Sequence, residues 1–567
     1  MNPSRAADLP GSPSRPPLAR GDGGGQPAPG GSRGAATTGA EVRRSLSRNF
    51  LATAVGRMVY LASRVALPPF ILSYVSLEEY GIWACCFILI SYLGMSAFGI
   101  SNVYIRYVAE YQARGDVPRI NRLVSTGLLV SSLLGALILV GLWVALPWII
   151  RAFKISPALA DTAFILLFAT SATFVLDLSI GSFAQVLIGL QRIGAQTTVW
   201  VASSVLEAAL IVVLLAAGLG VYALVIAFAV RFLVAIVAYV VLCRQELPGL
   251  SVGVRHFDRG MLRLFYGFGG IVQIAGLLGI FLYSIEKLIA GVFIGASATA
   301  LFDVGEKFPV MVSGIPSSMN AALLPALSHL HTLEGQDEAR SLYVQASRYI
   351  SLIGGVLMAY LAVCAEAVIV FWLGPAEQFR AATFILAVFC VAFQMHVVTG
   401  PASALYRGIG KPARELAYPL TQLALVSLLV GGGFALVGTT IEVIAIGVAG
   451  AMVVSTGLYE AYTNRFLSVG QAHFFWRVWA PGLVPYVLGA VIAVVVRPAV
   501  APVLATRWQA FGVLLAVGVV YAIVTPLVLY RFLCDANERT LVRQRLARVA
   551  GRVLPNRRQT AGGGTHR

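Results

Sequence analysis

Apolar stretches of twenty or more residues recur along nearly the whole length of this 567-residue chain. Each is long enough to cross the roughly 30 Å hydrocarbon core of a bilayer as a helix. Only 12% of the residues are charged, whereas soluble globular chains average about 25%. Helices and closed barrels alone satisfy their backbone polar groups in lipid, and these stretches lack the two-residue alternation of barrel strands. We therefore expect an all-α polytopic membrane protein.

The apolar stretches predict about fourteen transmembrane helices. We place them at 50–75, 81–102, 123–150, 160–186, 195–218, 220–243, 264–293, 299–325, 348–373, 381–405, 416–437, 440–463, 478–500 and 510–533. The gaps near 219 and 438 are short, so twelve or thirteen helices are the alternatives.

The distribution of Lys and Arg predicts the orientation, because cytoplasmic loops carry an excess of both. With the N-terminus inside, the cytoplasmic loops carry Arg106, Arg114, Arg119, Arg122, Arg192, Arg244, Arg255, Arg259, Arg263, Arg340, Arg348, Arg407, Lys411, Arg414, Arg465 and Arg477. The outer loops carry only Arg151, Lys154, Arg380, Arg497 and Arg507. Both termini are thus expected in the cytoplasm. This bias and anionic lipid headgroups account for the net charge of +17 without a nucleic-acid partner.

A shift of about 220 residues brings matching features of the two halves into coincidence, which is typical of an internal repeat. For example, the turn Gly189-Leu190-Gln191-Arg192 falls on Gly408-Ile409-Gly410-Lys411. Six helices per repeat give both halves the same orientation, so we expect two parallel six-helix lobes, a cleft between them and two extra helices. The expected division is a disordered tail at 1–44, lobes at 45–245 and 246–465, two helices at 466–533 and a basic tail at 534–567.

Ionisable residues inside the spans are the candidate working parts, since such groups normally face a partner or a wet cavity. Arg57 and Arg64 lie seven residues apart and so project from one helix face. At 1.5 Å per residue, Arg64 lies roughly 22 Å from the cytoplasmic end. We expect both to line the cleft, with a buried structural ion pair as the alternative. Pro68 and Pro69 are expected to kink this helix and free backbone carbonyls.

The second half supplies a matching set of charges. Glu286 and Lys287 fall near the counterpart of Arg64 at the repeat offset, and the following helix adds Asp303, Glu306 and Lys307. Asp303 and Lys307 either line the cleft or simply pair with each other four residues apart. The remaining polar candidates for the cleft are Asp177 and Gln273.

The sequence argues against an enzyme. Gly408 to Pro412 lacks the first glycine of a phosphate loop at the required spacing and the Ser or Thr after Lys411. The chain contains neither HExxH nor GxSxG. The outer loops are short, whereas a sugar polymerase or ligase is expected to carry a large one. We therefore expect a transporter with no cofactor and no metal site.

Several short motifs stand out in the chain, at Val75 to Trp83, Gly99 to Asn102, Arg106 to Tyr111, Glu286 to Gly291, Pro325 to Ser328 and Gly408 to Pro412. Together they resemble motifs of the polysaccharide flippases of the multidrug/oligosaccharidyl-lipid/polysaccharide exporter superfamily. The chain departs from many such proteins at Ala97-Phe98-Gly99, where an acidic residue commonly precedes the glycine.

The resemblance implies translocation of an undecaprenyl-pyrophosphate-linked oligosaccharide across a bacterial inner membrane by alternating access, for surface or exopolysaccharide biosynthesis. It implies pyrophosphate binding by Arg57, Arg64 and Lys287, because guanidinium suits phosphate geometry. Tyr60, Tyr92, Tyr104 and Gln273 are candidates for sugar contacts. Membrane lipids are expected partners, and a polysaccharide polymerase and chain-length machinery are further candidates.

Other functions remain open at this point. A multidrug antiporter of the same superfamily would need a net acidic cleft, which the arginines of the first helix oppose. A lipid II flippase would share both fold and mechanism. A scaffold in a polysaccharide assembly complex would be indifferent to replacement of Arg64.

Overall fold

The computed structural model describes residues 58–544, apart from 59, 95–99, 267–277, 280, 283, 321–322, 324–325, 327–335, 501–503, 536–537 and 541–542. Every regular element in this part of the chain is helical. Eleven helical segments there are long and apolar enough to cross a membrane. They coincide with the second to sixth and ninth to fourteenth predicted spans, which confirms the all-α polytopic class.

The helices of the first half run in chain order as α2 to α8. Their bounds are α2 Leu77–Gly94, α3 Ile100–Ala113, α4 Val117–Ala152, α5 Ala160–Ser179, α6 Phe183–Gly189, α7 Ile193–Ala216 and α8 Tyr222–Glu246. A helical stretch at 60–71 precedes them. The capping pair Ser76 and Glu79 begins α2, since each side chain accepts from the other's backbone N–H.

The helices of the second half and the C-terminal pair follow as α9 to α23. Their bounds are α9 Arg259–Tyr266, α11 Ile285–Phe293, α12 Ala296–Gly305, α13 Lys307–Ser317, α15 Gln336–Val363, α16 Ala365–Leu373, α17 Arg380–Val397, α18 Thr399–Gly408, α19 Ala417–Leu436, α20 Ile441–Phe466, α21 Gln471–Phe474, α22 Ala480–Val500 and α23 Arg507–Val528.

Several predicted spans are divided into shorter helices, among them 160–186, which divides after Ser179, and 381–405, which divides at Val398. The span at 299–325 begins earlier, at Ala296, and is broken at Glu306 into α12 and α13. The span at 348–373 begins at Gln336 and divides at Cys364 into α15 and α16. The predictions missed these breaks because hydropathy reports the length of an apolar stretch rather than the continuity of its helix. The spans at 50–75 and 264–293 lie partly outside the described residues.

The two short gaps are true helix ends. Gly218 and Gly220 have positive φ between α7 and α8, and Gly438 has φ +108° between α19 and α20. Glycine adopts this left-handed backbone without the clash that a Cβ causes, and so it commonly ends helices. The alternative of one long helix at either place is therefore wrong.

Positive φ angles repeat at the predicted offset. Lys154 and Gly374 are one such pair, and Gly218 and Gly438 are another. In the quoted four-residue turns, Gln191 has φ +62° and Gly410 has φ +71°. The residue after each left-handed position donates its backbone N–H to a carbonyl five residues earlier in both turns. The two halves thus share turn geometry as well as sequence spacing.

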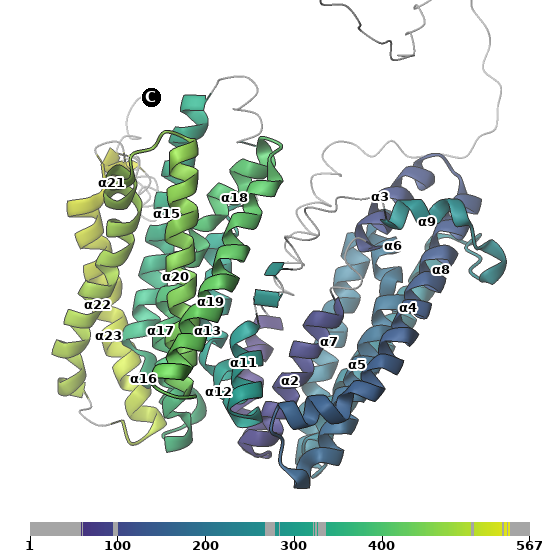
Figure 1. The fold of residues 1–567 in the computed structure, drawn as a ribbon, viewed down its shortest axis with the longest axis horizontal. Coiled ribbons are helices and arrows are strands. Elements are labelled where there is room, and N and C mark those ends of the chain that lie inside the picture. The colour runs from purple at the N-terminus through teal and green to yellow at the C-terminus, as the bar shows by residue number, and fades with distance from the viewer. Residues whose placement is uncertain are drawn as a thin grey trace, which may run out of the picture. The chain divides into compact units, whose positions relative to one another are not determined.

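The packing of helices is also the same in both halves. In the first half α5 packs against α2, α4 and α8, and α8 packs against α7. In the second half α17 packs against α12, α15 and α20, and α20 packs against α19. The additional helices α22 and α23 pack on α15 and α16 at one side of the second half (Figure 1). The residue boundaries of the lobes stay a prediction.

Close backbone approaches join the two halves near the predicted outer surface. A Cβ on Gly81 of α2 would lie 2.0 Å from the carbonyl oxygen of Ala296 at the start of α12. A Cβ on Gly291 of α11 would lie 2.4 Å from the ring of Phe153, just after α4. The Lys154 ammonium donates to the Phe293 carbonyl at 2.6 Å. Glycine at these two positions allows the helices to touch.

Candidate functional site

A cavity of about 430 Å³ lies where residues of both halves meet, and we name it the Arg64 cavity. The stretch 60–71 and α2 line it from the first half, and α11 to α13 line it from the second. Its polar and charged lining consists of Tyr60, Arg64, Tyr80, Lys287, Asp303, Glu306 and Lys307. Its apolar lining includes Trp83 and Phe87.

Arg64 is held by a buried carboxylate on its far side. Its guanidinium lies 3.2 Å from Oε2 of Glu207 on α7, and this carboxylate also accepts from Arg231 of α8 at 2.9 Å. The Arg64 guanidinium also lies 5.0 Å from the Tyr60 ring centroid and 5.9 Å from that of Phe87, within range of a cation–π attraction. The Arg64 side chain keeps 25% of its exposure, while Glu207 keeps 3%. Arg64 is therefore oriented from behind and still open to the cavity.

The prolines of this helix free a carbonyl, as predicted. Pro69 has no N–H for the carbonyl of Val65 four residues earlier. The indole Nε1 of Trp372 in α16 donates to that carbonyl at 2.6 Å. A buried carbonyl without a partner is costly, so Trp372 both satisfies the proline defect and ties α16 to the helix that carries Arg64.

The second half contributes a cluster of alternating charges. Lys287 pairs with Glu306 and lies 3.3 Å from Asp303. Lys307 lies 2.8 Å from the other oxygen of Asp303, across the helix break at Glu306. Asp303 also accepts from the hydroxyl of Tyr80 at 2.9 Å. Asp303 and Lys307 thus form the predicted i,i+4 pair and line the cavity as well.

The formal charge of the cavity lining is positive. Three cations, Arg64, Lys287 and Lys307, face two carboxylates, Asp303 and Glu306. Most of the remaining surface is apolar, and charges interact more strongly where little water screens them. Such a cavity suits a ligand in which an anionic group is attached to a part that is apolar or that can stack on aromatic rings.

Other predicted residues lie elsewhere. Glu286 is buried but does not line the Arg64 cavity, and its Oε1 has no hydrogen-bond partner among the described residues. Asp177 and Arg231 line a second cavity of about 370 Å³ in the first half. Arg57 and Gln273 lie outside the described residues. Glu286 and Asp177 do not line the Arg64 cavity, and their place in a shared cleft stays a prediction.

The candidate sugar-binding tyrosines separate in the same way. Tyr60 lines the Arg64 cavity, whereas Tyr104 is fully buried against Phe265 in a different core cluster. Tyr92 stacks on Phe281 and also lies outside the cavity lining.

Sequence reasoning named Glu306 only as one of the charges of its helix, and hydropathy did not reveal the helix break there. It missed Tyr80 and Trp83 as lining residues, because both stood only in a motif of the resemblance. The repeat offset contained a signal for them, because the start of α2 falls on the start of α12, whose packing together brings Tyr80 to Asp303.

Comparison with models of known protein families shows which family this chain belongs to. The model of the family described as Polysaccharide biosynthesis protein matches residues 46–331. The chain belongs to this family. The matched stretch contains every described residue of the Arg64 cavity lining.

This family member also has a curated relative of nearly equal length. The uncharacterized membrane protein EpsK of Bacillus subtilis (strain 168) is 20% identical over 517 residues. The match covers 89% of this chain and 99% of that protein.

Solved structures show the fold class of this family member. The lipid II flippase MurJ in an inward closed conformation aligns with a TM-score of 0.63 at 13% identity, covering 84% of this chain and 97% of MurJ. An inward-facing multidrug resistance MATE family transporter of the MOP superfamily aligns with a TM-score of 0.59 at 14% identity, covering 73% and 94%. The chain shares the fold of these two transporters.

Proposed function

We propose that this chain is a flippase that moves an undecaprenyl-pyrophosphate-linked oligosaccharide from the inner to the outer leaflet of a bacterial plasma membrane. It would act by alternating access, as a transporter rather than an enzyme, in surface or exopolysaccharide biosynthesis. The observation that carries the proposal is Arg64, which faces a cavity with excess positive charge. Family membership and the fold shared with solved transporters support the polysaccharide and transport parts of the proposal.

The substrate class follows from what the cavity can stabilise. A pyrophosphate cannot cross hydrocarbon unaided, because desolvating its charges is prohibitive. Arg64 offers a planar donor fork that matches phosphate geometry, and Lys287 and Lys307 offer ammonium point charges. A volume of about 430 Å³ falls in the range of small-molecule sites, enough for the pyrophosphate and its first sugar. The Tyr60 ring, beside Arg64, is placed to stack on that sugar.

Substrate binding would exchange one set of ion pairs for another. Without an anion, Arg64 is neutralised by Glu207, and the lysines are neutralised by Asp303 and Glu306. A pyrophosphate would take over Arg64, while Arg231 keeps Glu207 paired at 2.9 Å. Glu207 is then not left without a partner, which lowers the cost of releasing Arg64.

Alternation requires contacts between the halves that can be made and broken. The Tyr80–Asp303 hydrogen bond joins α2 to α12 directly beside the cavity. A pyrophosphate that attracts Lys287 and Lys307 would compete with Asp303 for both lysines. Loading of the cavity would therefore change the ion pairs of the carboxylate that joins the two halves, and so couple binding to their relative movement.

The membrane potential can supply the driving force. With the inside negative, outward movement of a negative charge releases about 2.3 kcal/mol per charge per 100 mV. Ion coupling is the alternative source. Glu286 suits that role better than Asp303, because its Oε1 lacks a hydrogen-bond partner among the described residues whereas Asp303 binds two lysines and a tyrosine.

Two rival substrates make different demands on the same cavity. A cationic drug would face three cations against two carboxylates, which opposes binding. Lipid II presents the same prenyl pyrophosphate chemistry, so the cavity alone does not separate it from another lipid-linked oligosaccharide.

The test is the composition of lipid extracts from a strain lacking this protein. The proposal predicts that a prenyl-pyrophosphate oligosaccharide accumulates and is cleared by the wild-type gene but not by Arg64→Gln. The matched control is Arg244→Gln, which removes an exposed arginine at the end of α8. Accumulation of lipid II would reassign the substrate. Full clearance by Arg64→Gln would point to a scaffold and overturn the proposal.

A further inference from the structure

A third cavity, of about 480 Å³, lies at the other end of the second half, and we name it the Arg348 cavity. It is bordered by the first turns of α15, by α21 with the π-helical turn Phe475–Trp479, and by the segment that follows α23. These are the starts of two membrane-spanning segments and the end of a third. The loop charges place all three at the cytoplasmic surface.

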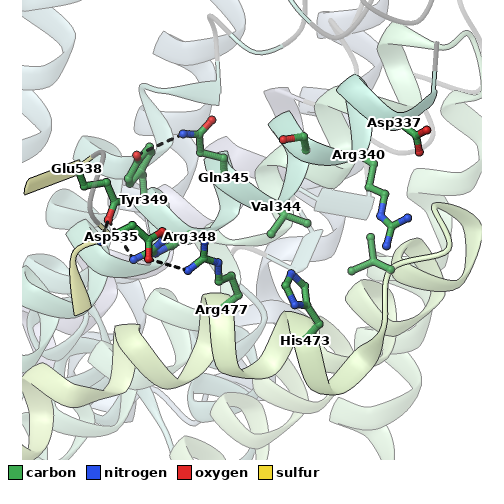
Figure 2. A pocket seen from close by; sticks show the side chains of 12 residues that line it. Asp337, Arg340, Val344, Gln345, Arg348, Tyr349, His473, Arg477, Asp535 and Glu538 are labelled. Atoms are coloured by element: carbon green, nitrogen blue, oxygen red, sulfur yellow. Dashed lines mark hydrogen bonds and ion pairs between the residues drawn. The ribbon is translucent and has the colours of Figure 1, made fainter. Parts of the chain in front are cut away.

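Three arginines and three acidic residues line this cavity. Figure 2 shows Arg348 and Arg477 converging on Asp535, with Arg340 and His473 on the other side of the opening. Arg348 lies 2.9 Å from Asp535 and 3.2 Å from Glu538. Arg477 contacts the same Asp535 carboxylate through two nitrogens, at 2.8 and 3.1 Å. Two arginines thus hold one carboxylate as they would hold a phosphate.

The basic side of the cavity is only partly satisfied by these carboxylates. Arg348 keeps 7% of its side-chain exposure, and its Nε has no hydrogen-bond partner among the described residues. No described residue pairs with Arg340, which lines the same space. Without Asp535 and Glu538, three arginines would face Asp337 alone. The cavity therefore has donor capacity beyond what its own acidic residues use.

We propose that the Arg348 cavity is a binding site for the phosphate group of an anionic membrane lipid, and that Asp535 and Glu538 occupy part of this site in its absence. The site is separate from the Arg64 cavity, and the proposal does not depend on what that cavity carries. A lipid phosphate would bind Arg340 and Arg477 and displace the Asp535 carboxylate.

The surroundings favour a lipid over a soluble phosphate. Trp476 and Phe475, next to Arg477, are exposed large aromatic side chains. Aromatic residues of this kind are enriched at the level of the lipid headgroups. Basic pockets beside the cytoplasmic ends of spans bind anionic headgroups by charge attraction. The cavity thus opens where lipid phosphates lie.

The Asp535 carboxylate behaves as a resident anion. Its hydrogen bonds with Arg477 and Arg348 hold its pKa below the ordinary Asp value. It is therefore charged at neutral pH and competes for the same donors as a phosphate. Removal of this competitor should strengthen phosphate binding, whereas a purely structural tie between the tail and α15 makes no such prediction.

The experiment measures lipid binding to the purified full-length protein in detergent by native mass spectrometry. The probes are phosphatidylglycerol and phosphatidylcholine, with inorganic pyrophosphate as the soluble alternative. Arg340→Gln/Arg477→Gln is expected to weaken phosphatidylglycerol binding about tenfold. The matched control, Arg244→Gln/Arg465→Gln, removes two exposed arginines predicted on the same side and should change binding less than about twofold.

The most decisive comparison uses a variant of the segment after α23 in which both competing carboxylates are neutralised. Asp535→Asn/Glu538→Gln should bind phosphatidylglycerol about threefold more tightly than wild type, since two competing charges are removed. Equal or weaker binding by this variant, with thermal unfolding showing that it is folded, would overturn the proposal. Binding of pyrophosphate with no preference for phosphatidylglycerol over phosphatidylcholine would overturn the lipid assignment. If Arg340→Gln/Arg477→Gln unfolds, the single variant Arg340→Gln replaces it in the lipid-binding measurement and should also weaken phosphatidylglycerol binding.

Discussion

The guanidinium of Arg64 and the carboxylate of Glu207 meet 3.2 Å apart although 143 residues separate them in the chain. Arg64 opens onto the cavity, while Glu207 is buried behind it and also binds Arg231. The pair fixes the position of the Arg64 guanidinium. It also gives Arg64 a carboxylate partner whenever no anion occupies the cavity.

Replacement of Arg64 should distinguish charge from geometry. We expect Arg64→Gln to lower transport about 100-fold, because a charge-assisted phosphate contact in a poorly hydrated site is lost. Arg64→Lys should retain an intermediate rate, since an ammonium keeps the charge but not the donor fork. Flipping rates in proteoliposomes provide the measurement. Equal flipping rates for Arg64→Lys and wild type would show that the donor geometry of the guanidinium does not contribute to transport.

Removal of Glu207 should destabilise the protein. In Glu207→Gln, buried Arg231 keeps its charge without a carboxylate, and the loss of one partner of a buried pair costs about 3–5 kcal/mol. Thermal unfolding in detergent should show a lower Tm. The double variant Glu207→Gln/Arg231→Gln should recover much of the lost Tm, because the buried charge of Arg231 is then removed as well and only Arg64, which opens onto the cavity, lacks its carboxylate partner. A single variant as stable as wild type would contradict the pairing.

Substitution of Gly81 should separate α2 from α12. A Cβ there would lie 2.0 Å from the Ala296 carbonyl oxygen, so one of the two backbones has to move. We expect Gly81→Ala to slow transport severalfold and to raise thiol labelling of a Ser297→Cys reporter from the outer side. Gly141→Ala is the control, because no atom lies within 4 Å of its Cβ position. Unchanged labelling in Gly81→Ala would argue against this contact.

The hydrogen bond from Trp372 to the Val65 carbonyl should contribute to stability. Trp372→Phe keeps an aromatic ring but leaves the carbonyl opposite Pro69 without a donor, at a cost of about 1–3 kcal/mol. The comparison is Trp476→Phe, which changes an exposed indole. In detergent, Trp372→Phe should unfold at a lower denaturant concentration than wild type, whereas Trp476→Phe should not. Equal stability of the two variants would show that the carbonyl finds another partner.

The contact of Asp535 with Arg477 and Arg348 should depend on pH. The two arginines lower the Asp535 pKa in the folded protein. The contact therefore stabilises the docked tail fully above the ordinary Asp pKa near 3.9, and the effect is lost as pH falls through the lowered folded-state value. Protease accessibility of the C-terminal segment should rise in that acidic range. Asp535→Asn should remove this dependence, and a tail equally protected throughout would oppose it.

Much of the fold is predictable from the sequence because the bilayer imposes one length on every span. Eleven spans were located from apolar length alone, and the offset between the turns at Gly189 and Gly408 marked the repeat. The breaks at Glu306 and Cys364 were not predictable in this way. A broken helix and a continuous one have the same mean hydropathy when tertiary contacts satisfy the freed backbone groups.

The site was predictable in part. Depth in the membrane singled out Arg64, and the repeat singled out Lys287 and its neighbours. Which of them share a cavity depends on rotation about each helix axis, which one sequence does not fix. Glu286 and Lys287 are adjacent in the chain, yet only Lys287 lines the Arg64 cavity. Asp177 likewise lines a separate cavity in the first half.

The most direct test of the central claim compares two fluorescent prenyl-linked oligosaccharides in proteoliposomes that contain the purified full-length protein. One lipid carries a pyrophosphate, and the other carries a neutral linker with the same sugars. We predict that wild-type protein flips the pyrophosphate lipid at least tenfold faster than the neutral one, and that Arg64→Gln removes this preference. Equal rates for both lipids, unchanged in Arg64→Gln, would contradict the claim that the cations of the Arg64 cavity carry the substrate.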